Sequence, residues 1–239
     1  MHCHFGFDMA GLRAARSRGD VLVVVDVLSF STTVATGTAR GVRFHPAGSH
    51  RRAEAVSRAT GAVLSVSRRE PPRAGAYSLS PLSYRDAPAG LEVALRSPNG
   101  ARMAVLSRGK VAALVVGALV NASAAGAAAA AGARAAGVGV TVLACGERTP
   151  GGGRRRFAAE DFLGAGAVIA AVDLPRTGDA EAPVRAFEAS REDLEGFLLE
   201  TESGRELAAA GYREDVVHAA RLDSLASVPL LLDGVLRGR

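Results

Sequence analysis

The feature that most constrains the fold is a series of short valine-rich runs, each hydrophobic along its whole length and bounded by glycine or polar residues. They are VLVVVDV (21–27), GVRFHPA (41–47), AVLSV (62–66), EVALRS (92–97), AALVVGAL (112–119) and VGVTVLAC (138–145). Continuous rather than alternating hydrophobicity is typical of strands that are covered on both faces. Segments of helical character lie between them, at 31–40, 50–60, 100–108, 122–136 and 158–172. This alternation predicts βα units with right-handed crossovers.

We therefore expect an α/β fold of three layers, α/β/α, around a mostly parallel or mixed sheet. The chain has 239 residues, 48% of them hydrophobic, and no linker interrupts it, so we predict one domain spanning residues 1–239. Two strand-to-helix segments of similar design, beginning at LVVVDVLSFSTTVA and VTVLACGERT, raise the alternative of two pseudo-repeated halves. The C-terminal part predicts amphipathic helices, one of them opened by Ser203 and closed by Gly211, and VPLLLDGVLRG (228–238) predicts a last strand or a turn.

The basic charge of the chain does not indicate nucleic-acid binding. Lysine and arginine number 29 against 24 acidic residues, but nearly all are arginines and the chain is rich in alanine and glycine, which is typical of a coding bias. Aromatic residues make up 5% and do not interleave with the basic ones. Two distant cysteines, no secretory signal and no clean apolar span of about 20 residues predict a reduced, cytoplasmic protein without a membrane helix.

Polar residues collect where the predicted strands end. Asp26 follows the first run, and SPNG (97–100), Asn121 and CGER (145–148) follow later ones. Ligands of open parallel sheets bind beyond the carboxyl ends of the strands, so we expect these residues to line one site. Asp26 suits either a helix cap or a Mg²⁺ ligand.

The other polar residues at these strand ends each allow two interpretations. Thr32 and Thr33 are either first-turn residues of a helix or part of an anion site at its N-terminus. Asn99 and Gly100 form a turn that also lets backbone amides approach an oxyanion. Asn121 either caps the next helix or contacts a ligand.

The run CGERTPGGGRRRFAAEDFLGAG (145–166) joins a strand end to a helix. Its arginines 154–156 are either a solvated face or anion ligands, and Arg148, fixed at the strand end, is the better candidate for a bidentate phosphate contact. Glu160 and Asp161 either favour the helix N-terminus or hold Mg²⁺ together with Asp26. Cys145 is either a small buried residue or a nucleophile.

Several of these motifs, in this order, resemble the 2-phosphosulfolactate phosphatase family over most of the chain. They are VVVDVLSFSTTVATGTARG, SPNGAR, VVGALVNASAAG, CGER with RFAAEDFLGAGAVI, and SGRELAAAGYREDV. The resemblance implies an α/β/α, Mg²⁺-dependent acid phosphatase that hydrolyses 2-phospho-3-sulfolactate. It places the family's aspartate on Asp26, its threonines on Thr32 and Thr33, its Asn-Gly motif on Asn99 and Gly100, its asparagine on Asn121 and its Glu-Asp pair on Glu160 and Asp161.

The chain departs from the family pattern at two places. Ser29 stands where an arginine commonly follows the first motif, and in the loop 67–83 the family's Gly-Glu-Arg, Gly-Phe-Asp and Asn-Ser-Pro segments survive only as Ser80 and Pro81. Such losses put the identity of the accepted anion in question.

Our leading hypothesis is a phosphomonoester hydrolase acting on a small anionic phosphorylated substrate. Asp26, Glu160 and Asp161 are the expected catalytic and metal-ligating residues, and Thr32, Thr33, Asn99, Gly100, Asn121 and Arg148 are the expected substrate ligands. A family member that has lost catalysis and binds an anionic metabolite or a partner protein is the alternative. The apolar face of 122–136 suits the core or a homodimer equally well.

Overall fold

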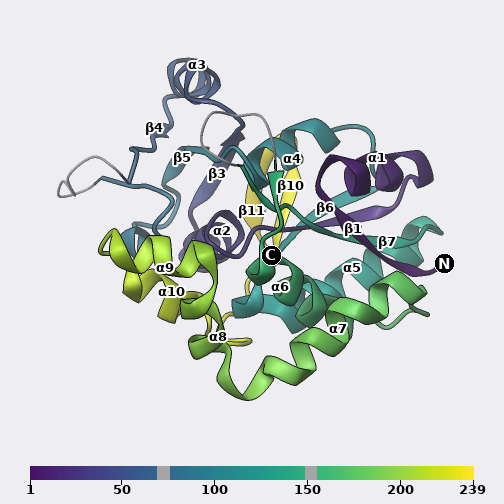
Figure 1. Cartoon of the computed structure of the whole chain (residues 1–239). Helices are drawn as coiled ribbons and strands as arrows, with labels where there is room; N and C mark the ends of the chain where they lie inside the picture. Colours follow the sequence, from purple (N-terminus) through teal and green to yellow (C-terminus); the bar gives the residue numbers. More distant parts are fainter. Residues whose placement is uncertain (69–75, 149–154) are drawn as a thin grey trace.

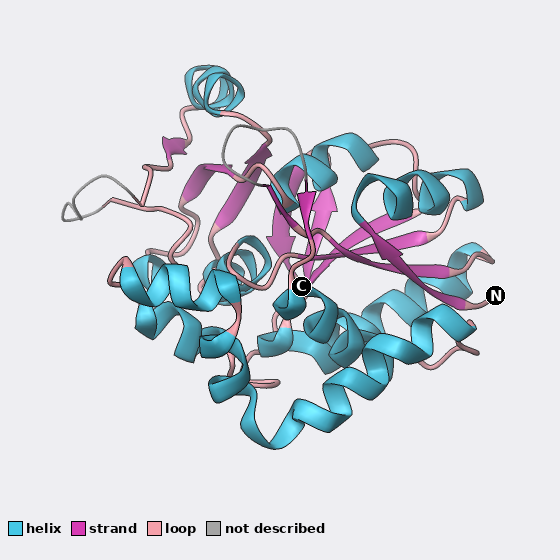
Figure 2. Ribbon diagram, viewed as in Figure 1, coloured by secondary structure: helices cyan, strands magenta, loops and turns pink. Residues whose placement is uncertain are grey.

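The computed structural model of the protein describes residues 1–68, 76–148 and 155–239. A single nine-stranded sheet forms its centre (Figures 1 and 2). Across the sheet the strands follow in the order β1 (Cys3–Phe7), β7 (Val140–Ala144), β2 (Val21–Val25), β6 (Ala113–Gly117), β10 (Pro229–Leu232), β11 (Val235–Gly238), β3 (Arg43–Ala47), β5 (Glu92–Arg96) and β4 (Val63–Leu64). A separate ribbon joins β8 (Glu147–Arg148) to β9 (Arg155–Arg156).

The sheet consists of two parallel blocks joined by an antiparallel hairpin. β1, β7, β2 and β6 pair in parallel, and so do β3, β5 and β4. The C-terminal hairpin of β10 and β11 lies between the blocks and is antiparallel to both neighbours, with one register pair to β6, Leu230 with Val115, and one to β3, Leu236 with Phe44. The expected sheet is therefore confirmed as a mixed one, and 228–238 forms two strands around a turn.

Helices cover both faces of the sheet, as the three-layer prediction requires (Figure 2). One face carries α5 (Ala122–Ala136), α6 (Ala159–Ala170), α7 (Gly178–Ser190), α8 (Leu194–Glu200) and α10 (Arg213–Ala219). The other carries α1 (Asp8–Arg18), α2 (Phe30–Ala39) and α4 (Gly100–Ser107). In addition, α3 (His50–Thr60) packs on β3 and β5, and α9 (Glu202–Ala209) packs against α10.

The β2 strand shows why its sequence is apolar throughout. Val21, Val23 and Val25 belong to the hydrophobic cluster of α5 and α6, whereas Leu22 and Val24 belong to the cluster of α1 and α2. All five side chains are buried, so neither face of this strand tolerates a polar residue. The predicted strands and helices 21–172 are confirmed to within two residues at each end.

Two features of the fold differ from expectation or were not expected, and a third agrees with it. The N-terminal residues form β1, which pairs in register with β7, and then α1. The helix expected to open at Ser203 begins at Glu202 instead, because Thr201 is its N-cap and its hydroxyl accepts a hydrogen bond from the Gly204 N–H at 3.0 Å. In the described ranges, no helix is long and apolar enough to cross a membrane.

A close contact between α6 and α7 predicts that one glycine is required for stability. A Cβ at Gly166 would collide with the carbonyl group of Pro183 on α7. Since two backbones meet there, Gly166→Ala is expected to lower the free energy of unfolding by about 1–3 kcal/mol, measured by urea unfolding. Gly178, the first residue of α7, has open space around its α carbon, so Gly178→Ala is the matched control. Equal effects of the two changes would contradict the packing argument.

Candidate active site

A pocket of about 230 Å³ lies where the segments that follow β2 and β5 meet. Eight of its twelve lining residues are polar or charged, and its walls come from segments far apart in the sequence. The lining residues are Asp26, Leu28 and Ser29 after β2, Ser97, Pro98 and Asn99 after β5, Arg68 and Leu79 from the segment between β4 and β5, Glu147 of β8, and Ser203, Glu206 and Leu207 of α9.

Asp26 lies at the base of this arrangement and is only 4% exposed. Its Oδ2 accepts hydrogen bonds from the Gly100 N–H at 2.7 Å and the Ser97 hydroxyl at 3.3 Å, and its Oδ1 accepts one from the Phe30 N–H at 3.4 Å. Position 100 must be glycine because a Cβ there would overlap the ring of Phe30. One carboxylate thus joins the end of β2 to the start of α4.

A second carboxylate, that of Glu147, faces the same pocket. Its Oε1 accepts hydrogen bonds from the Asn99 side-chain amide at 2.9 Å and from the Arg148 N–H at 2.7 Å. Burial, and then the charge of Glu147, raise the pKa of Asp26 from its ordinary value of 3.8 to about 6. The Asn99 Oδ1 atom is buried and has no hydrogen-bond partner among the described residues. The pocket therefore presents negative charge and a free amide oxygen.

Asp161 and Glu160 lie beside the pocket rather than in its wall. The two oxygens of Asp161 accept hydrogen bonds from the Val27 N–H at 2.7 Å and the Gly146 N–H at 2.9 Å, which ties the ends of β2 and β7 together. Burial raises the pKa of both Asp161 and Glu160, and the charges of Asp26 and Glu160 raise that of Asp161 further. Ser203 lowers the pKa of Glu160 but does not offset the effect of burial.

Of the three carboxylates predicted to hold Mg²⁺ together, Asp26 alone therefore faces the pocket. Across residues 1–68, 76–148 and 155–239, no three His, Cys, Asp or Glu side chains are grouped closely enough to hold a metal ion by themselves. The predicted metal site therefore stays a prediction, and Glu160 and Asp161 do not line the pocket with Asp26.

The threonines predicted to bind substrate donate their hydroxyl hydrogen bonds to backbone carbonyls instead. The Thr32 hydroxyl donates to the Val27 carbonyl at 2.8 Å, and the Thr33 hydroxyl donates to the Leu79 carbonyl at 2.7 Å. At the start of α2, the Thr33 N–H donates to the Ser29 carbonyl at 2.9 Å. Thr32 thus stabilises the loop after β2, Thr33 joins α2 to the segment at Leu79, and neither side chain lines the pocket.

Asn121 and Arg148 also lie outside the pocket lining. The Asn121 side chain is fully buried, with its Oδ1 accepting from the Ala118 N–H at 2.9 Å and its Nδ2 donating to the Ser227 carbonyl at 2.9 Å. Arg148 pairs with Arg155 in the β8–β9 ribbon. Of the predicted substrate ligands, Asn99 lines the pocket and Gly100 reaches it through its bond to Asp26.

Cys145 is buried, and the described arginines of the run 154–156 form ion pairs within the chain. Cys145 is fully buried, and burial raises the pKa of its thiol, which does not favour a nucleophilic thiolate. Arg155 forms an ion pair with Asp8 at 2.6 Å, and Arg156 pairs with Glu202 and Glu206. Arg154 lies outside the described residues.

Sequence reasoning did not single out Glu147 and Arg68. Glu147 follows β7 almost directly, so the rule that polar residues gather at strand ends was sufficient to find it. Arg68 lies in a segment without periodicity, and no pattern in the sequence distinguishes it from its neighbours Arg69 and Arg73.

With this geometry established, comparison with known proteins is informative. The model of the family described as 2-phosphosulpholactate phosphatase matches residues 9–234. The chain belongs to this family. The resemblance predicted from the sequence motifs and the enzyme class, a phosphomonoester hydrolase, are therefore confirmed at family level.

Relatives within the family are distant but extend over most of the chain. A probable 2-phosphosulfolactate phosphatase of Thermotoga petrophila is 28% identical over 218 residues, 89% of each chain. One of Carboxydothermus hydrogenoformans is 29% identical over 216 residues, 87% of this chain and 84% of its own. The 2-phosphosulfolactate phosphatase of Methanothermobacter thermautotrophicus is 35% identical over 79 residues, about a third of each chain.

The raised pKa of Asp26 predicts a pH-dependent stability. Because the folded chain holds this proton more tightly than the unfolded chain, the stabilisation is full below pH 3.8 and is lost as the pH rises through about 6. Without metal, the free energy of unfolding of the wild-type protein is expected to fall between pH 4.5 and 7.5 by about 1–3 kcal/mol more than that of Asp26→Asn. Urea unfolding in EDTA measures this. The same pH dependence in both proteins would show that Asp26 is not the titrating group.

The buried amide of Asn121 predicts a structural rather than a ligand-binding role. Asn121→Ala leaves the Ala118 N–H and the Ser227 carbonyl without their partner, so we expect the free energy of unfolding to fall by about 1–3 kcal/mol. The KM for a phosphate ester should not change. Unchanged stability with a raised KM would instead support the substrate contact that the sequence predicted for Asn121.

Proposed function

We propose that the protein is a Mg²⁺-assisted phosphatase that hydrolyses 2-phospho-3-sulfolactate, or a closely related phosphorylated hydroxy-acid, to the alcohol and inorganic phosphate. One observation carries the proposal. Asp26 and Glu147 face a single small pocket at the ends of β2 and β7, and the buried Oδ1 of Asn99 beside them has no partner among the described residues. The family to which the chain belongs supports the reaction.

The donor set of this pocket suits Mg²⁺ better than the predicted trio. Two carboxylates and an amide oxygen are hard oxygen ligands, and Mg²⁺ uses one or two carboxylates while keeping several waters. A cation between Asp26 and Glu147 would also relieve the repulsion that raises the pKa of Asp26. We therefore propose Asp26, Glu147 and Asn99 as ligands, with Glu160 and Asp161 as acidic neighbours.

When bound, Mg²⁺ supplies Lewis-acid polarisation of the phosphoryl group. The chain supplies the positioning. Gly100, Ser97 and Phe30 fix the carboxylate of Asp26 through three hydrogen bonds, and Asn99 and the Arg148 N–H fix that of Glu147. Because these donors are mostly backbone N–H groups, the carboxylates keep their geometry as charge develops on the phosphate ester.

The alternative of a binding protein without catalysis also has an observation in its favour. Both oxygens of Asp161 are engaged by backbone amides, and no trio of acidic, His or Cys side chains is assembled within the described ranges. Such a protein would bind sulfolactate or its phosphate ester without releasing phosphate.

The proposal predicts a metal-dependent activity that depends on two carboxylates. Purified protein is expected to release phosphate from 2-phospho-3-sulfolactate with Mg²⁺ and to stop when EDTA is added. Asp26→Asn and Glu147→Gln should each lower kcat/KM by about 100-fold or more, because each removes a charge that the metal site needs. Phosphate release, measured at several Mg²⁺ concentrations, gives kcat/KM for each variant and its dependence on the metal.

Glu192→Gln, an exposed change in the short turn that follows α7, is the matched control and should retain wild-type activity. Glu160→Gln should have a smaller effect than Glu147→Gln, and the reverse order would favour the ligand set predicted from the sequence. Full activity in both Asp26→Asn and Glu147→Gln would contradict the proposal. Thermal stabilisation by substrate without phosphate release would favour the binding protein.

Three further expectations stay predictions. They are the cytoplasmic location, the homodimer and the lack of a nucleic-acid partner. The face of α5 that suited either the core or a dimer contributes Ala125, Ala129 and Ala133 to the hydrophobic cluster of this chain.

A further inference from the structure

Arg68 is the one cation among the described residues that line the pocket. The carboxylates of Asp26, Glu147 and Glu206 line it as well. A dianionic phosphoryl group entering this pocket meets negative charge on most sides unless a metal is bound. A substrate with additional acidic groups needs a further positive partner, and Arg68 is the described lining residue that provides it.

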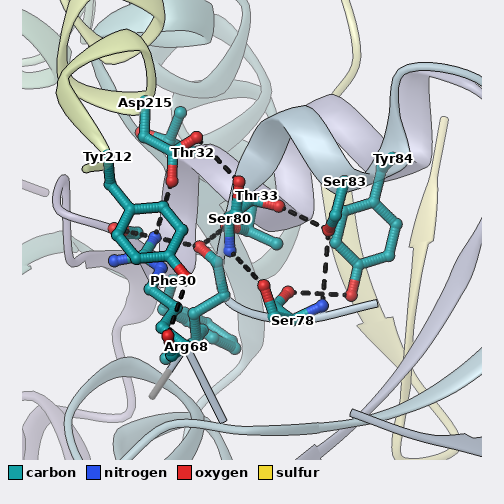
Figure 3. A network of polar contacts seen from close by, with 12 residues as sticks. Phe30, Thr32, Thr33, Arg68, Ser78, Ser80, Ser83, Tyr84, Tyr212 and Asp215 are labelled. Atoms are coloured by element: carbon teal, nitrogen blue, oxygen red, sulfur yellow. Dashed lines mark hydrogen bonds and ion pairs between the residues drawn. The ribbon is translucent and has the colours of Figure 1, made fainter. Parts of the chain in front are cut away.

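The guanidinium of Arg68 is held in place by contacts on several sides (Figure 3). Its Nη2 donates to the Ser29 hydroxyl at 2.6 Å and to the Leu79 carbonyl, and it lies 3.3 Å from the carboxylate of Asp215. The ring of Tyr212 lies against the guanidinium, 5.2 Å from its central carbon to the ring centroid. A long flexible side chain is thereby confined to one orientation.

The residues that confine Arg68 are themselves fixed. Asp215, buried on α10, accepts a hydrogen bond from the Ser80 hydroxyl at 2.7 Å, and the Tyr212 hydroxyl donates to the Arg68 carbonyl at 2.7 Å (Figure 3). The start of α10 and the segment that ends at Ser80 therefore hold both the backbone and the side chain of Arg68. An arginine fixed in advance loses less conformational entropy when it binds an anion.

Part of the hydrogen-bonding capacity of this guanidinium is unused. All of its hydrogen bonds to described residues come from Nη2, and its Nε is buried without a partner among them. A guanidinium carries five N–H donors in a planar fork that matches two oxygens of a carboxylate or sulfonate. Arg68 thus combines a location in the pocket wall, a fixed orientation and free donors.

We propose that Arg68 binds one of the acidic groups that the substrate carries besides the phosphoryl group, a carboxylate or a sulfonate, and so selects phosphomonoesters of small acids over phosphomonoesters of neutral alcohols. This proposal rests on the proposed function, which assigns the phosphoryl group to the end of the pocket at Asp26 and Glu147. Ser29 lines the same pocket and accepts a hydrogen bond from Arg68, so the guanidinium is joined to the wall of that pocket.

A purely structural role is the rival interpretation, in which Arg68 only ties its segment to α10. The two roles differ in one measurable quantity. This is the selectivity between phosphate esters that carry further acidic groups and phosphate esters that carry none. A structural clamp affects all esters alike, whereas an anion ligand affects those that carry the acid.

The experiment compares kcat/KM for 2-phospho-3-sulfolactate, 2-phospholactate and isopropyl phosphate, which carry two, one and no additional acidic groups. Arg68→Gln is expected to lower the preference for 2-phospho-3-sulfolactate over isopropyl phosphate by about 10- to 100-fold, the range for one charged hydrogen-bonded contact. The loss should be in KM more than in kcat. Arg68→Lys should restore part of the preference, because it keeps the charge without the planar fork.

Two controls separate charge from folding. Arg85→Gln removes an exposed arginine from the same segment and should leave the preference unchanged. Thermal unfolding of each variant reports whether the fold survives, and Asp215→Asn, which keeps the shape of the residue that holds Arg68, should lower the preference less than Arg68→Gln does. An equal loss on all three esters in Arg68→Gln would overturn the inference.

Failure of the proposed function has a different signature. If the wild-type protein hydrolyses none of the esters, binding of sulfolactate itself is measured by calorimetry. Binding that weakens about 10-fold or more in Arg68→Gln but not in Arg85→Gln supports the anion site without catalysis. No binding up to millimolar concentrations, or binding that is equal in both variants, overturns the role of Arg68.

Discussion

The hydrogen bond from the Gly100 N–H to the Asp26 carboxylate is the contact on which the rest of the site depends. Within the described part of the sheet, the two parallel blocks are joined by a hairpin that has one register pair with each block. The bond of 2.7 Å adds a direct connection between the segment after β2 and the start of α4. Asp161 makes the equivalent connection between the ends of β2 and β7. Carboxylates thus join the strand ends that form the pocket.

Using carboxylates for this purpose concentrates negative charge at a site that is proposed to bind a phosphate ester. Burial raises the pKa of Asp26, Glu160 and Asp161, and neighbouring carboxylates raise them further. The charge of Glu147 acts on Asp26 and Glu160, and the charges of Asp26 and Glu160 act on Asp161. Such an arrangement is costly for a purely structural centre, because apolar residues of similar size hold strands together without desolvating charge. In the metal-dependent enzyme that we propose, a bound cation would offset this repulsion.

The hydrophobicity pattern was sufficient to predict the strands and helices between residues 21 and 172, but not β1 and α1, and not which strand-end residues face the pocket. A buried hydroxyl or amide next to a strand end has two possible partners, a ligand or an unpaired backbone group, and the composition of the segment is the same in either case. Thr32 and Asn121 satisfy backbone groups, whereas the Oδ1 of Asn99 has no hydrogen-bond partner in the part of the chain that the structure describes. That difference arises from tertiary packing, which local sequence does not encode.

Ser29 illustrates the same limit from the other direction. As an isolated position it departs from the family resemblance by lacking an arginine, which suggested a lost anion ligand. In the fold its hydroxyl accepts a hydrogen bond from Arg68, 39 residues away in the chain. A serine at this position leaves space for a guanidinium that arrives from a different segment. A substitution that removes a charge from one position therefore does not by itself remove that charge from the site, and the loss of an anion ligand has to be judged in three dimensions.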